Sequence, residues 1–131
     1  MVVHNFVLSC ADYRILGHIQ DYVGRDEYYL FTLVGGSLGA LSRPEWMKVF
    51  REHLEFEMER NPITTLWIFD HMDCKYYQAL TKRLDTNEEH IQYISMLTNE
   101  LQQIYPNLII KPYLIDRIQA TPCLDCVASN I

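Results

Sequence analysis

Two cysteines and one histidine in this chain have the types and spacing that suit a metal ion. Cys10 begins the stretch Cys-Ala-Asp-Tyr-Arg, and His71 and Cys74 form a His-x-x-Cys pair much later in the chain. Two thiolates and one imidazole are donors that zinc accepts readily. Three protein ligands leave a fourth position open, which is the arrangement of a catalytic zinc. We therefore expect these three residues to bind zinc.

An acidic residue, Asp12, and a basic residue, Arg14, follow Cys10 closely. If Cys10 ends a strand, they can turn back and pair beside the metal, with Arg14 keeping Asp12 ionised. Asp12 would then accept a hydrogen bond from a zinc-bound hydroxide and orient it near neutral pH. Two alternatives stay open. Asp12 itself could bind zinc and close the site, or the pair could be only a structural salt bridge.

A glycine-rich stretch, Gly-Gly-Ser-Leu-Gly, begins at Gly35. Glycines let a backbone pass close to a metal and expose N–H groups to an anion. Such donors would stabilise an anionic product. The stretch therefore predicts a substrate-binding loop formed by Gly35, Gly36 and Ser37. A plain tight turn without a binding role would have the same sequence pattern.

Apolar runs and helix-like segments alternate around these residues. The runs typical of buried parallel strands cover residues 2–9, 28–34, 64–69 and 108–115, and residues 35–39 read as a loop. This alternation predicts an α/β fold in which helices flank both faces of a mostly parallel central sheet. Residues 1–131 would form a single domain, with 116–131 as a C-terminal extension. Ligands bind such sheets outside the carboxyl ends of the strands, so Cys10, Gly35 and His71 should converge at one edge.

Composition excludes several functional classes. Hydrophobic residues make up 49% of the 131 residues and aromatic residues 12%, which suits one folded domain and argues against disorder. The formal net charge is -6 and no basic stretch follows one face, so a nucleic-acid partner is not expected. The longest apolar runs are too short to cross a bilayer, so we expect no membrane partner either.

The cysteines also bear on location. The first residues show no secretory pattern, and cysteines in such a chain indicate thiols or metal ligands rather than disulfides. We therefore expect a cytoplasmic protein. Cys123 and Cys126 form a CxxC pair that could be a redox pair or half of a metal site, but incidental thiols are the simpler interpretation. His18, which follows Arg14 by one helical turn, is a weaker candidate for a proton shuttle.

The Cys-x-Asp-x-Arg motif followed by His-x-x-Cys resembles the active-site signature of the β-class carbonic anhydrases. The resemblance covers residue 2 to about residue 115. It implies that Cys10, His71 and Cys74 bind zinc and that Asp12 and Arg14 form a dyad. It also implies reversible hydration of carbon dioxide to bicarbonate by a zinc-bound hydroxide, in a homodimer or higher homo-oligomer.

This chain departs from the family pattern at two places. Val-Gly-Gly-Ser stands where the family usually has Arg-Asn-Ala-Gly, and Lys75 stands where it usually has glycine. Two other functions therefore remain as alternatives. One is turnover of another small electrophile, such as carbonyl sulfide or carbon disulfide, because access to the pocket selects among such molecules. The other is a non-catalytic, regulatory zinc protein whose site Asp12 closes.

Overall fold

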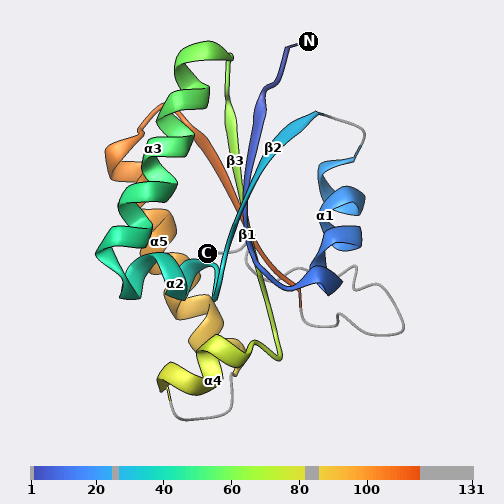
Figure 1. Cartoon of the computed structure of the whole chain (residues 1–131), viewed down its shortest axis with the longest axis vertical. Helices are drawn as coiled ribbons and strands as arrows, with labels where there is room; N and C mark the ends of the chain where they lie inside the picture. Colours follow the sequence, from blue (N-terminus) through green and yellow to red (C-terminus); the bar gives the residue numbers. More distant parts are fainter. Residues whose placement is uncertain (1, 25–26, 82–85, 116–131) are drawn as a thin grey trace.

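The four strands of this protein form one sheet in which every neighbouring pair is parallel. The structure is a computed structural model, and it describes residues 2–24, 27–81 and 86–115. The strand order is β2-β1-β3-β4 (Figure 1). The strands are β1 (Asn5–Cys10), β2 (Tyr28–Leu33), β3 (Thr65–His71) and β4 (Ile109–Ile115). The predicted α/β fold with a parallel central sheet is thus confirmed.

Helices cover both faces of this sheet. They are the short 3-10 helix η1 (Tyr13–Ile15) and the α-helices α1 (Leu16–Val23), α2 (Ser37–Ser42), α3 (Pro44–Arg60), α4 (Lys75–Thr81) and α5 (Asn87–Ile104). Helix α1 lies on one face, and α2, α3 and α5 lie on the other (Figure 1). Because both faces are covered, the central strands β1 and β3 are buried along their whole length.

Alternation of side chains along the strands divides the core into two clusters. Phe6 and Leu8 of β1 pack toward α3 and α5, whereas Val7 between them packs toward α1. In β3, Ile68 belongs to the first cluster and Phe69 to the second. The two clusters hold the central strands in fixed register, and this register sets where each strand ends.

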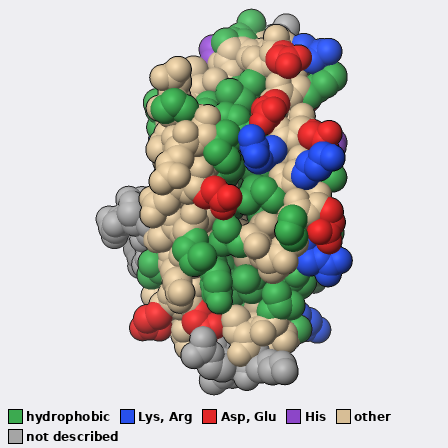
Figure 2. All heavy atoms as spheres, turned by 90° about the vertical axis from the view of Figure 1, so that its left-hand side faces the viewer, with side chains coloured by type: hydrophobic (Ala, Val, Ile, Leu, Met, Phe, Trp, Pro, Cys, Tyr) green, Lys and Arg blue, Asp and Glu red, His purple; other side chains and the backbone are tan. Residues whose placement is uncertain are grey.

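Figure 2 shows the side of the molecule that α3 and α5 cover. Hydrophobic side chains occupy much of the middle of this face, and charged side chains lie mostly along one side of it. Arg51 of α3 donates a hydrogen bond to the Tyr105 hydroxyl at 3.1 Å, and this hydroxyl in turn donates to Glu55. These contacts join α3 to the end of α5. Among the helices of the described ranges, none has the apolar length that a membrane span requires.

The glycine-rich stretch differs from the loop expected at residues 35–39. Gly35 and Gly36 have positive φ angles of 77° and 52°, and helix α2 begins directly after them. The amide of Ala40 donates to the carbonyl of Gly36 at 3.1 Å, which starts this helix inside the glycine-rich stretch. A Cβ atom at Gly39 would overlap the carbonyl oxygen of Val34, so α2 packs closely against the end of β2.

Two helical glycines therefore predict opposite effects of alanine. Gly39→Ala should lower the free energy of unfolding by about 1–3 kcal/mol, because the new methyl group meets a backbone oxygen. Gly17→Ala in α1 is the matched control, since a Cβ there meets nothing within 4 Å. It should raise stability by up to about 1 kcal/mol through helix propensity. Urea denaturation measures both, and equal effects would contradict the close packing of α2.

Candidate metal centre

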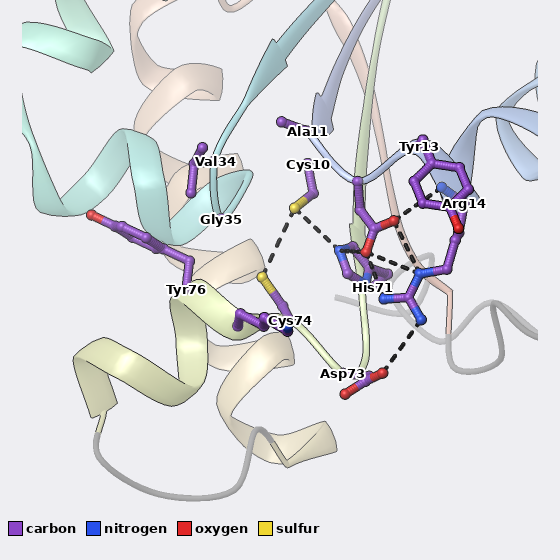
Figure 3. A pocket seen from close by; sticks show the side chains of 12 residues that line it. Cys10, Ala11, Tyr13, Arg14, Val34, Gly35, His71, Asp73, Cys74 and Tyr76 are labelled. Carbon is purple, nitrogen blue, oxygen red and sulfur yellow. Dashed lines mark hydrogen bonds and ion pairs between the residues drawn. The ribbon is translucent and has the colours of Figure 1, made fainter.

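The three predicted ligands meet at the carboxyl edge of the sheet (Figure 3). Cys10 is the last residue of β1, His71 is the last residue of β3, and Cys74 directly precedes α4. The two sulfur atoms are 3.8 Å apart, and Nε2 of His71 lies 3.1 Å from the sulfur of Cys10. One donor atom from each residue lies within 4.8 Å of the others. The predicted convergence of these residues is confirmed.

The spacing of the sulfur atoms suits zinc. Two thiolates at about 2.3 Å from a tetrahedral zinc ion lie about 3.8 Å from each other. Cys10 and Cys74 have this separation and are free thiols, since a disulfide requires about 2.05 Å. The three residues are only 2–6% exposed, so the donor atoms lie at the edge of the core rather than on the open surface. The donor set and its geometry therefore fit a zinc ion.

His71 is held in the orientation that a metal ligand needs. Its Nδ1 atom lies 2.7 Å from the carbonyl oxygen of Met72, and this contact requires the proton on Nδ1. Nε2 is then free to offer its lone pair toward the sulfur atoms. The amide of Met72 donates to the carbonyl of Ile115 in β4 at 2.9 Å, which fixes the turn. A hydrogen bond from the other ring nitrogen is a usual feature of metal-binding histidines.

A hydrogen bond joins the sulfur atoms of the two thiol groups, which lie 3.8 Å apart. This bond lowers the pKa of Cys74 below its usual value. The same bond, together with burial, raises the pKa of Cys10 above its usual value. The pair therefore loses one proton readily and holds the other strongly. A metal ion that binds here displaces this proton, which couples metal affinity to pH.

Backbone donors support both sulfur atoms. The amide of Gly35 donates a hydrogen bond to Cys10, and the amide of Tyr77 donates one to Cys74. Both bonds favour the thiolate form of the sulfur that accepts them. The centre therefore receives contacts from the loop before α2 and from α4, in addition to the two strand ends.

Asp12 and Arg14 form the predicted pair beside the centre. Nε of Arg14 donates to Oδ1 of Asp12 at 3.0 Å, and Nη2 donates to Oδ2 at 2.6 Å. Asp12 also caps η1 by accepting the amide of Arg14 at 3.0 Å. These hydrogen bonds lower the pKa of Asp12 to about 2. Arg14 reaches on to Asp73 at 3.5 Å, so it links the turn after β1 to the turn after β3.

Asp12 does not belong to the group of three converging donors. Its Oδ2 atom lies 3.8 Å from Nε2 of His71, and both of its oxygens accept hydrogen bonds from Arg14. The carboxylate is therefore held at the margin of the centre rather than within it. This arrangement favours a site with an open fourth position over one that Asp12 closes.

The glycine loop uses its amides inside the protein. Besides the bond from Gly35 to Cys10, the amide of Gly36 donates to the carbonyl of Leu33 at 2.9 Å. The amide of Ser37 donates to Asp70 at 3.0 Å. The donors that the sequence offered to an anion are thus engaged, and only Gly35 of the three lines the cavity over the centre. A substrate-binding role for Gly35, Gly36 and Ser37 stays a prediction.

Sequence reasoning missed Asp70. Its side chain is 1% exposed, and it accepts hydrogen bonds from Ser37 and from the hydroxyl of Tyr77. Burial raises the pKa of this carboxyl group to about 6, although the hydrogen bonds from Tyr77 and Ser37 oppose the rise. The available signal was an acidic residue at the end of an otherwise apolar strand, directly before the predicted ligand His71.

A cavity of about 540 Å³ opens over the centre. Besides the three ligands and the Asp12–Arg14 pair, the cavity is lined by residues that follow strands β1, β2 and β3: Ala11, Tyr13, Val34, Gly35, Asp73, Lys75 and Tyr76. The ring of Tyr76 packs against Gly35, and its hydroxyl contacts Ser42 at 2.9 Å. His18 is buried in α1 and does not line this cavity. Cys123 and Cys126 lie outside the described residues.

No family model matches the chain, and no match to a curated protein was found. The likeness to β-class carbonic anhydrases therefore stands on the two motifs in the sequence, and the metal centre stands on the geometry described above.

Ligand substitutions should separate this centre from the other thiols. Cys10→Ser and Cys74→Ser should each lose most of the bound zinc, because two remaining donors hold it poorly. The double variant Cys123→Ser/Cys126→Ser is the matched control and should keep one zinc per chain. Elemental analysis after dialysis measures the content. If the control loses zinc while the single variants keep it, the metal site lies elsewhere.

The effect of Arg14 on the pKa of Asp12 should be measurable in a pH titration. The pKa of Asp12 falls from 3.8 to about 2 in the folded protein, so the pair stabilises the fold above about pH 3.8. This contribution is lost as the pH falls through about 2. Carbon-13 NMR of the Asp12 carboxyl group should give a higher midpoint in Arg14→Gln. Arg43→Gln, which breaks a surface pair with Glu45, should leave the midpoint unchanged.

Proposed function

We propose that this protein is a zinc-dependent enzyme that converts carbon dioxide and water reversibly to bicarbonate and a proton. The observation that carries the proposal is the buried group of two sulfurs and one imidazole with an aspartate–arginine pair beside it. The resemblance of the two motifs to those of the β-class carbonic anhydrases supports the same reaction. Zinc fits the donors, and an open fourth position is what a catalytic metal requires.

Each residue has a defined task in this proposal. Cys10, His71 and Cys74 hold the metal, which when bound supplies an acidified water as the nucleophile near neutral pH. The carboxylate of Asp12 accepts a hydrogen bond from this nucleophile and so orients it toward the substrate. Arg14 keeps that carboxylate ionised and fixed through its two-point contact, because these hydrogen bonds lower the pKa of Asp12.

The cavity is consistent with a small apolar substrate and an anionic product. Ala11 and Val34 give one part of the wall an apolar surface that a linear, neutral molecule can contact. Lys75 adds a positive charge to this cavity, in which Arg14 is already paired with Asp12 and Asp73. Gly35 contributes by passing its backbone close to Cys10, where a side chain would meet the ring of Tyr76.

One observation favours a second candidate, a zinc protein without turnover. The amides of Gly36 and Ser37 are engaged with Leu33 and Asp70, so they offer no donors to an anionic product. The volume of the cavity also accommodates electrophiles larger than carbon dioxide, such as carbonyl sulfide. The non-catalytic protein and the enzyme for another electrophile would both use the same three metal ligands.

Stopped-flow hydration of carbon dioxide tests the proposal. The zinc-loaded protein should exceed Cys74→Ala, and Asp12→Asn should lower kcat by about 100-fold through loss of the orienting acceptor. Asp21→Asn, which changes an exposed carboxylate in α1, is the matched control and should keep the full rate. Zinc content is measured for every variant, so that loss of metal is not taken for loss of chemistry.

Three results would contradict the proposed reaction. A rate equal to that of Cys74→Ala argues against any hydration by the centre. Full zinc occupancy without turnover points to the non-catalytic protein. Release of sulfide from carbonyl sulfide, without hydration of carbon dioxide, points to the other small electrophile.

A further inference from the structure

We propose that Asp70 is the positioning residue of the metal centre: it ties the loop before α2 to helix α4, and so holds the two backbone amides that support the cysteine sulfurs. The inference rests on the proposed metal function and deepens it. It assigns a role to a buried carboxylate that neither binds the metal nor lines the cavity.

The carboxylate of Asp70 makes contacts on both of its oxygens. Oδ1 accepts the amide of Ser37 at 3.0 Å and the hydroxyl of Ser37 at 3.2 Å. Oδ2 accepts the hydroxyl of Tyr77 at 2.7 Å. Ser37 begins α2, and Tyr77 lies in α4, so one side chain of β3 connects two helices that are far apart in the sequence.

Both connected segments reach the sulfur atoms. Gly35, two residues before Ser37, donates its amide to Cys10. Tyr77 itself donates its amide to Cys74. Asp70 therefore fixes, through Ser37 on one side and Tyr77 on the other, the two N–H donors that the thiolates receive. Hydrogen bonds from fixed donors hold a thiolate ligand in a defined position. This position decides how well the ligand fits a metal ion.

The loop is built around this carboxylate. A Cβ atom at Gly36 would overlap Oδ1 of Asp70, and the φ angle of Gly36 is 52°, so glycine is required on both counts. Ser37 is completely buried. The glycine pair thus serves the approach of the loop to Asp70, and Ser37 acts through Asp70 rather than through the cavity.

Cobalt binding tests this role, because Co²⁺ bound by thiolates absorbs in the visible and near-ultraviolet range. Asp70→Asn removes the charge at nearly constant shape, and Tyr77→Phe removes the hydroxyl that contacts Oδ2. Each should weaken Co²⁺ binding by about 10- to 100-fold and shift the sulfur-to-cobalt band. Tyr105→Phe is the matched control, since it removes a hydroxyl that contacts a carboxylate on α3 instead. It should leave affinity and spectrum unchanged.

Wild-type affinity and an unshifted band in both variants would overturn the inference. If Asp70→Asn fails to fold by circular dichroism, Tyr77→Phe decides alone, and failure of both to fold shows a general role in the core instead. Absence of Co²⁺ binding in the wild type would defeat the proposed metal function itself. Hydration of carbon dioxide by a wild type whose Asp70 and Tyr77 variants bind Co²⁺ normally would defeat only the present inference.

Discussion

The parallel pairing of β1 with β3 is the constraint on which the metal centre depends. Ser9 lies opposite Phe69 in this pairing, so the two strands end side by side and present Cys10 and His71 at one edge. Core clusters on both faces of the sheet hold this register. A shift by one residue would turn one ligand to the opposite face of the sheet, and the donor atoms would no longer meet.

Charge explains why this buried edge favours a cation. The sulfur atoms of Cys10 and Cys74 lie 3.8 Å apart, and the carboxylate of Asp70 is close enough to raise the pKa of Cys10. The guanidinium of Arg14 is directed to Asp12 and Asp73 at the margin and contacts neither sulfur in the described structure. A divalent ion supplies the positive charge that the interior of the centre needs. Metal binding and stability of the fold should therefore be coupled.

The convergence of Cys10 and His71 was accessible from the sequence because each follows an apolar run, and parallel strands end at a common edge. The Asp12–Arg14 pair was also accessible, since its contacts are local. The role of Asp70 was not, because its partner Ser37 comes from a segment 33 residues earlier and is brought near only by the fold. For the same reason the sequence predicts a loop at residues 35–39, whereas α2 begins at Ser37. Its glycines indicated flexibility, whereas the close approach to β2 and Asp70 requires them.

X-ray absorption at the zinc edge of the purified protein tests the central claim most directly. We expect two sulfur scatterers at about 2.3 Å and two nitrogen or oxygen scatterers at about 2.0–2.1 Å. One of the lighter atoms is the imidazole of His71, and the other belongs to a solvent molecule at the open position. Preparations without zinc, or a coordination sphere without two sulfurs, would contradict the account.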